Sequence, residues 1–329
     1  MTAVDMAITG SLASDHLMVF PGRFADQLLP GSIERVSLSF LADHLEVRRG
    51  GVGANIAFGL GLLGLRPVLV GSAGLDFAPY DAWLRAAGVD TAWVRVSETL
   101  HTARFVCTTD ADQNQIATFY AGAMAEARHI DLRRVAREAA LGLVLVGADD
   151  PQAMLRHTAA AHGLGVPVAA DPSQQLARLE RDEVRLLVDG AHLLFTNEYE
   201  ADLLRERTGW TDRQVLERVG TWITTRGADG VVLSGAGQDP VGVAAAPTDH
   251  VVDPTGAGDA FRAGFLAGVA RGRSQVRAAQ LGCVVATTVL ESVGTQEYKI
   301  VAADVAGRAA RAYGPEVAGE LESVLAATG

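Results

Sequence analysis

The chain has 329 residues, of which 49% are hydrophobic and 20% are charged, so it is long and apolar enough to bury a substantial core. Its 28 basic and 39 acidic residues give a formal net charge of −11, which argues against general binding to nucleic acid. Cys107 and Cys283 make neither a disulfide scaffold nor a zinc pattern. The N-terminus lacks the pattern of a signal peptide, and no charge-free apolar run of about 18 residues occurs, which predicts a soluble cytoplasmic protein with no membrane partner.

Short apolar runs alternate with segments of helical length along most of the chain. Such runs indicate strands buried on both faces, and their alternation with helices is typical of a parallel sheet. The sequence therefore predicts an α/β fold with a Rossmann-like, doubly wound and mostly parallel sheet and helices on both faces. The predicted strands are 6–10, 67–71, 143–147, 166–170, 192–196 and 222–225. The predicted helices are 55–63, 80–87, 151–162, 182–188 and 212–219, followed by three that begin near Ala257, Gln275 and Ala303.

Two segments, at about 17–49 and 99–121, interrupt this alternation. Both contain polar and apolar residues in the period-two pattern of strands, at 35–41 and 103–109. We interpret them as excursions that pair into a small β-sheet lid over one end of the main sheet; two long surface loops are the alternative. No linker divides the chain, so a single domain over 1–329 is expected.

The basic residues exclude two common phosphate-binding devices. All of them are arginine except Lys299, which follows Tyr298 without a glycine-rich loop. A Walker A loop and a protein-kinase ATP site both need a lysine in a defined place. The triplet Gly59, Gly61 and Gly64 matches the dinucleotide pattern but follows no strand, so close helix packing is the better explanation.

The strongest motif is the string DPTGAGDAF at 253–261, which precedes a helical run. Gly256 and Gly258 allow a sharp turn, after which the N–H groups of Ala257, Gly258 and Asp259 point one way at the positive end of a helix. Such a cradle stabilises developing phosphate charge, and Asp259 at its mouth can accept a proton from an attacking hydroxyl. The alternative is an ordinary loop with Asp259 as a helix cap.

This string resembles the second signature of the ribokinase-like (PfkB) carbohydrate kinases, in which the aspartate is the catalytic base and the glycine turn is the anion hole. RGGVGANIA at 49–57 is similar to the first signature. There the resemblance implies that Gly51 admits a sugar close to the backbone and that Asn55 binds its hydroxyls; a tight turn capped by Asn55 is the alternative. The family's ribokinase-like fold, an α/β core with a β-sheet lid, is implied for this chain.

Two later motifs follow in the family's order. Asn197 and Glu200 resemble an Asn-x-x-Glu motif that arranges Mg²⁺ and phosphate, with Glu200 acting on the metal through water. Thr225, Gly227 and Gly230 lie in a string similar to the loop that borders ATP. Arg226 and Asp229 depart from the family's usual residues in that loop, which puts the nucleotide affinity in doubt but not the location of the site.

Residues around the expected substrate site favour a purine nucleoside. Asp15, in the string GSLASD at 10–15 that ends the first strand, can bind two vicinal ribose hydroxyls, and Phe105 and Phe119 can stack on a flat base. Gln174 and Gln175 suit adenine, because an amide can donate and accept at once. Each has an alternative: a buried cap for Asp15, lid packing for the phenylalanines and exposed loop positions for the glutamines.

Further strings resemble the bacterial, ribokinase-like branch of adenosine kinases, at 20–24, 36–40, 101–105, 170–178 and 290–297. In that branch the matching residues around the nucleoside are those at Ser11, Asp15, Gly51, Asn55, Phe105, Phe119 and Gln175. The resemblance implies an adenosine kinase of purine salvage that uses ATP with Mg²⁺. It makes potassium, held by carbonyls near the anion hole and the 291–294 stretch, a further candidate. It also implies a homodimer through the lid sheets. A kinase of another nucleoside or of ribose, and a non-catalytic nucleoside-binding protein, are the alternatives.

Overall fold

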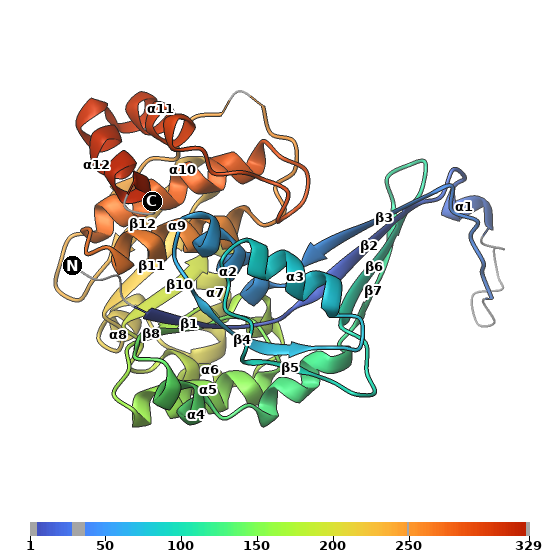
Figure 1. Cartoon of the computed structure of the whole chain (residues 1–329), viewed down its shortest axis with the longest axis horizontal. Coiled ribbons are helices and arrows are strands. Elements are labelled where there is room, and N and C mark those ends of the chain that lie inside the picture. Colours follow the sequence, from blue (N-terminus) through green and yellow to red (C-terminus); the bar gives the residue numbers. More distant parts are fainter. Residues whose placement is uncertain (1–4, 28–36, 249, 327–329) are drawn as a thin grey trace.

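Two sheets of different size organise the chain in the computed structural model, which describes residues 5–27, 37–248 and 250–326 (Figure 1). The larger sheet has nine strands in the order β13-β12-β11-β10-β9-β8-β1-β4-β5. Its pairs from β5 to β11 are parallel, whereas β12 and β13 extend it as antiparallel strands. The strands are β1 (Asp5–Thr9), β4 (Val68–Ala73), β5 (Val94–Val96), β8 (Leu141–Val146), β9 (Val168–Ala170), β10 (Leu193–Asn197), β11 (Thr221–Thr225), β12 (Val231–Ser234) and β13 (Val241–Val243).

Helices cover both faces of this sheet, and each face has its own apolar core (Figure 1). One core contains side chains from α2 (Val52–Leu62), α3 (Ala78–Ala86), α9 (Ala257–Ala270), α10 (Gln275–Leu290), α11 (Ala302–Tyr313) and α12 (Pro315–Ala326). The other contains side chains from α4 (Leu132–Glu138), α5 (Pro151–Gly163), α6 (Arg181–Val188), α7 (Glu198–Thr208) and α8 (Asp212–Leu216). The predicted doubly wound architecture is confirmed. Among the described helices, none is long and apolar enough to cross a membrane.

The strand order reverses direction between β1 and β8, which are neighbours in the sheet. From β1 the sheet grows through β4 and β5, and from β8 it grows the other way through β9 and β10. Adjacent loops diverge at such a point and leave a crevice beyond the carboxyl ends of the strands, where α/β proteins bind ligands. Ser11 follows β1 and Ala148 follows β8, so both lie at this crevice.

A separate four-stranded sheet projects from the main body (Figure 1). Its order is β3 (His44–Gly50), β2 (Ala13–Val19), β6 (Ala103–Thr109) and β7 (Gln115–Tyr120). Only the β2–β6 pair is parallel. This sheet is the predicted lid, and it includes the strand expected at 103–109.

The strand predicted at 35–41 was wrong in its described part. Residues 35 and 36 lie outside the described residues, and 37–41 form no strand. Instead Phe40 packs on Phe20 and on Phe24 of the short helix α1 (Phe24–Gln27), with ring centroids 5.1 and 4.8 Å away. The polar–apolar alternation at 35–41 therefore places Phe40 in this aromatic cluster, and its described part does not form a strand. The lid strand begins later, at His44.

Close helix packing explains the glycine triplet that matches the dinucleotide pattern. Gly59 and Gly61 lie inside α2 rather than after a strand. A Cβ atom on Gly59 would be 2.7 Å from the Cβ of Ala263 in α9, and one on Gly61 would be 2.1 Å from the carbonyl oxygen of Ala87. Gly59 and Gly61 therefore allow α2 to approach its neighbours, as predicted.

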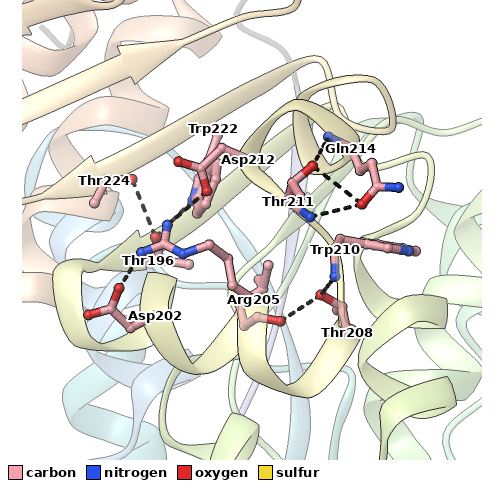
Figure 2. A network of polar contacts seen from close by, with 11 residues as sticks. Thr196, Asp202, Arg205, Thr208, Trp210, Thr211, Asp212, Gln214, Trp222 and Thr224 are labelled. Carbon is pink, nitrogen blue, oxygen red and sulfur yellow. Dashed lines mark hydrogen bonds and ion pairs between the residues drawn. The ribbon is translucent and has the colours of Figure 1, made fainter.

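A polar network fastens α7 and α8 to strands β10 and β11 (Figure 2). The Trp222 indole donates to Thr196 Oγ1 at 2.8 Å, joining the two strands. Arg205 of α7 contacts Asp202 and donates to Asp212 at 3.0 Å, which joins the two helices. The Arg205 guanidinium also lies over the Trp222 ring, 5.9 Å from its centroid, which joins α7 to β11. The network fixes α7, whose N-cap is the predicted Asn197 and whose first turn carries Glu200.

Candidate active site

A cavity of about 430 Å³ lies between the carboxyl ends of the strands and the lid. Every residue that the sequence assigned to the substrate lines it, together with the N-cap of α9 and one residue of its first turn. These residues are Ser11, Asp15, Gly51, Asn55, Phe105, Phe119, Gln174, Gln175, Gly256 and Asp259. Residues up to 248 positions apart in the chain thus meet at one place, the crevice that the sheet topology predicts.

Asp259 lies in the first turn of α9, partly buried at the cavity wall. Its Oδ2 accepts a hydrogen bond of 2.8 Å from Asn55 Nδ2. Burial raises the pKa of Asp259 to about 6, opposed by the Asn55 hydrogen bond and the charge of Arg262. A carboxylate with a pKa near neutrality suits a general base, because it is largely ionised at pH 7 and still holds a proton well.

The start of α9 is shaped to expose its N–H groups. Gly256 caps the helix with φ +81°, and a Cβ atom there would be 2.8 Å from Cγ2 of Thr295. Only glycine fits this left-handed, crowded position. The first N–H groups of a helix, here those of Ala257, Gly258 and Asp259, have no partner within the helix and attract anions.

The first glycine-rich turn brings the backbone of α2 against the end of β1. Gly51 has φ +98°, and a Cβ atom there would be 2.5 Å from the carbonyl oxygen of Ser11. Ser11 Oγ in turn accepts from the Val52 N–H at 3.1 Å. This close approach leaves the cavity wall without side chains at Gly51.

Three lid residues share the face that looks onto the cavity. Asp15 of β2 lies opposite Phe105 of β6, which lies opposite Phe119 of β7. Residues directly opposite across a sheet are on the same face. Burial raises the pKa of the Asp15 carboxyl to about 6, with Arg48 lowering it and Asp253 raising it.

The loop after β9 supplies the polar end of the cavity. Gln175 is buried, and its Nε2 donates to the carbonyl of Asp149 at 2.8 Å. Its Oε1 has no hydrogen-bond partner among the described residues. Gln174 Oε1 accepts from Ser173 Oγ at 2.7 Å. Arg178, which also lines the cavity, is an exposed cation that the sequence did not single out.

A buried ion pair behind Asp259 was missed from the sequence. Arg262 of α9 lies one helical turn after Asp259 and contacts Asp171 through Nε at 2.6 Å and Nη2 at 2.7 Å. Its Nη1 donates to the carbonyl of Gly258 at 3.1 Å, and Glu200 lies 3.9 Å from Nη2. The sequence did contain one sign of this pair, because Arg262 is a single arginine in an otherwise apolar helical run.

The residues predicted to border ATP lie at the ends of β10 and β11, outside the 430 Å³ cavity. Asn197 and Thr225 are directly paired in register. Asn197 Oδ1 accepts from the Glu200 N–H, and Glu200 Oε2 accepts from the Asn197 N–H, both at 2.8 Å. Gly227 lies in a short 3-10 turn after β11, and Gly230 (φ +87°) ends that turn before β12.

The lid and the glycine turn are joined at their base by Arg48 of β3. Its Nη1 donates to Asp253 Oδ2 at 3.0 Å, while the same carboxylate accepts from the Thr255 and Gly294 N–H groups at 2.9 and 3.1 Å. Arg48 also contacts Glu46 at 2.7 Å. Asp253 is therefore a structural anchor of the turn.

Residues 12–301 match the pattern of the pfkB family carbohydrate kinases. A nucleoside kinase from Burkholderia thailandensis, solved ligand-free, is 33% identical, with a TM-score of 0.83 over 92% of this chain and 99% of that chain. The same kinase has been solved in complex with inosine and with ADP-inosine. The nucleoside kinase of Methanothermobacter thermautotrophicus is 32% identical over 252 residues, 75% of this chain and 80% of that protein. That of Methanocaldococcus jannaschii is 28% identical over 249 residues, with the same coverage.

The Arg262→Met variant is expected to lower the free energy of unfolding by about 3–5 kcal/mol, because it leaves Asp171 buried without its cation. Arg213→Met is the matched control, since Arg213 pairs with Glu217 on the surface of α8. We expect the control to leave the free energy of unfolding nearly unchanged, because solvent screens an exposed ion pair. Denaturant unfolding measures both, and equal losses would contradict a structural role for the buried pair.

Proposed function

The chain belongs to the pfkB family of carbohydrate kinases, and we propose that it transfers the γ-phosphate of ATP to the 5′-hydroxyl of adenosine, giving AMP and ADP. Its similarity to nucleoside kinases over most of its length supports an ATP-dependent nucleoside kinase. The observation that carries the proposal is the single cavity in which a carboxylate at a helix N-terminus meets the lid aromatics and Asp15. The adenine preference rests on Gln174 and Gln175.

In the proposed reaction, Asp259 accepts the proton of the 5′-hydroxyl as its oxygen attacks the γ-phosphorus in line. The N–H groups of Ala257, Gly258 and Asp259 stabilise the negative charge on the transferred phosphoryl group. Asp15 binds the ribose hydroxyls, which holds the 5′-hydroxyl toward Asp259. Phe105 and Phe119 stack on the base, and the lid that carries them excludes water from the phosphoryl group.

Magnesium fits this site as an ion held mainly by ATP. Among the described residues, no three acidic, histidine or cysteine side chains gather to hold a metal directly. Glu200, whose Oε2 lies 3.9 Å from Nη2 of Arg262 in α9, is the carboxylate that the motif assigns to the metal, and it would act on the ion through water. Mg²⁺ keeps several waters and neutralises phosphate charge when bound in this way.

Potassium is proposed at the backbone carbonyls near the glycine turn and in the 291–294 stretch. The two carboxylates at this place are already paired, since Arg48 donates to Asp253 at 3.0 Å and Arg308 Nη1 donates to Glu291 at 2.7 Å. Carbonyl oxygens would therefore supply the ligands, and we derive no step through potassium.

Inosine and guanosine are the second candidate substrates, and Arg178 is the observation that favours them. A guanidinium donates readily to the O6 and N7 atoms of a 6-oxopurine, whereas the amino group of adenine is itself a donor. The Gln175 Oε1 that lacks a partner can accept from the N1–H of such a base. Adenine and a 6-oxopurine would stack on the same two phenylalanines of the lid, so stacking does not distinguish them.

The exposed outer face of the lid supports a homodimer through the lid sheets. Leu45, Val47, Ile116 and Tyr120 are between 43% and 57% exposed. The sheet register places these four side chains on one face of the lid, and Asp15 and Phe105 on the other face. A row of exposed apolar side chains of this kind favours association.

The Asp259→Asn variant is expected to bind adenosine but to lose at least about 100-fold in kcat, because it cannot accept the proton. The exposed Asp182→Asn is the matched control and should be unchanged. For the unaltered enzyme, kcat should rise with pH through about 6, since only the ionised Asp259 acts as a base and burial raises its pKa to about 6.

An ADP-release assay with adenosine, ATP and Mg²⁺ measures this prediction. Turnover of Asp259→Asn near that of the unaltered enzyme would refute the base assignment. Nucleoside binding without any ADP release by the unaltered enzyme would favour the non-catalytic alternative.

A substrate panel separates the two base preferences. If adenine is preferred, kcat/KM should be highest for adenosine. If Arg178 reads O6, Arg178→Gln should lower kcat/KM for inosine and guanosine about ten-fold more than for adenosine. Arg181→Gln, at the exposed start of α6, is the control. A preference for free ribose would overturn the stacking role of Phe105 and Phe119.

Light scattering is expected to give twice the 34.5 kDa chain mass at micromolar concentration. Val47→Asp should shift the mass to that of one chain, because it puts a charge on the outer lid face. Leu186→Asp, at an exposed site on α6, should not. A single-chain mass for the unaltered protein would contradict the dimer.

A further inference from the structure

The side chain of Asn55 reaches from α2 to Asp259 through an amide with two ends. Its Nδ2 donates to Asp259 at 2.8 Å, and its Oδ1 accepts from Gln296 Nε2 at 2.8 Å. An amide turned by 180° would put an oxygen against the carboxylate and a nitrogen against Gln296. The orientation of Asn55 therefore decides whether Asp259 is held or repelled.

A chain of buried groups determines that orientation. Gln296 Nε2 has two hydrogens and two acceptors, Asn55 Oδ1 and the Tyr80 hydroxyl oxygen at 2.6 Å. The Tyr80 hydroxyl then donates to the carbonyl of Gly50 at 2.9 Å. A carboxylate at one end and a backbone carbonyl at the other are both acceptors only, so every donor in between has one possible direction.

The three side chains of this hydrogen-bonded series are buried, so water does not compete for their hydrogen bonds. Asn55, Gln296 and Tyr80 are 6%, 1% and 8% exposed. Thr295 Oγ1 lies 3.0 Å from Asn55 Oδ1 but also 2.9 Å from the carbonyl of Arg49, and its single hydrogen serves one of them at a time. Gln296 is therefore the constant donor to Asn55.

From this geometry we propose that Gln296 and Tyr80 are positioning residues, which fix the Asn55 amide so that it holds the Asp259 carboxylate in its reactive orientation. The inference rests on the proposed role of Asp259 as the base. It gives a function to Gln296, a residue of the 290–297 string that does not line the cavity. The groups reach the site from α3, from α2 and from the segment after α10.

Gln296→Met tests the proposal, because methionine keeps the volume and removes the amide. We expect kcat to fall about ten-fold or more with little change in the nucleoside KM. The rise of kcat with pH should also move to higher pH, since a carboxylate that loses a donor has a higher pKa. Gln280→Met, at a buried glutamine of α10 away from the cavity, is the matched control.

The pH readout separates positioning from general damage. The charged groups that act on Asp259 are Arg262 of its own helix, Asp171 after β9 and Glu200 of α7, and none is altered by the variant. A merely structural loss would lower kcat by the same factor at every pH. Asn55→Ala combined with Gln296→Met should be no slower than Asn55→Ala alone, because the two act through one contact.

Tyr80→Phe gives a second, milder test that applies if Gln296→Met does not fold. It removes the acceptor of the second Gln296 hydrogen and should lower kcat in the same direction, with the same pH displacement. Normal kcat and pH dependence in a folded Gln296→Met or Tyr80→Phe variant would overturn the proposal, as would additive losses in the double variant. If Asp259→Asn is inactive while these variants are normal, only the positioning role fails; if Asp259→Asn is active, the base itself is wrong.

Discussion

The hydrogen bond between Asn55 and Asp259 is the contact on which the site depends, because it joins the two glycine-rich turns of the chain. At the first turn, Gly53 and Gly10 approach so closely that a Cβ on Gly53 would be 2.7 Å from the Gly10 backbone, which starts α2 directly at the end of β1. At the second, Gly256 starts α9 in a left-handed conformation. Two helix N-termini therefore meet above the point where the strand order reverses, one with an amide and the other with a carboxylate and the N–H groups of its first turn.

Arginine side chains neutralise carboxylates around this site, in a chain that has a single lysine. Arg262 is buried against Asp171, so it fixes the start of α9 rather than reaching out to a ligand. Arg48 neutralises Asp253 and ties the lid to the glycine turn. The planar guanidinium can contact several acceptors at once, as both residues do, which a lysine ammonium cannot do in the same geometry. In the proposed reaction, the backbone N–H groups at the start of α9 therefore bind the phosphate.

The main sheet and the cavity could be predicted from the sequence, whereas the support behind them could not. Strands such as Val68–Ala73 are buried on both faces and read as continuous apolar runs, and the site residues lie in short strings with a recognisable order. The Arg262–Asp171 pair and the Gln296–Asn55 contact join residues 91 and 241 positions apart, and no local pattern records such a pairing. The described part of the strand expected at 35–41 forms no strand, because Phe40 packs in an aromatic cluster and not in a sheet.

Phe105 and Phe119 lie on β6 and β7 of the outlying sheet, whereas Asp259 and the side chains that hold it come from α2, α3, α9 and the segment after α10. If the proposed roles hold, substitutions on β6 and β7 can alter which base is accepted without changing the residues that hold the proton acceptor. A scaffold arranged in this way allows related proteins to diverge in substrate specificity while they keep the same reaction.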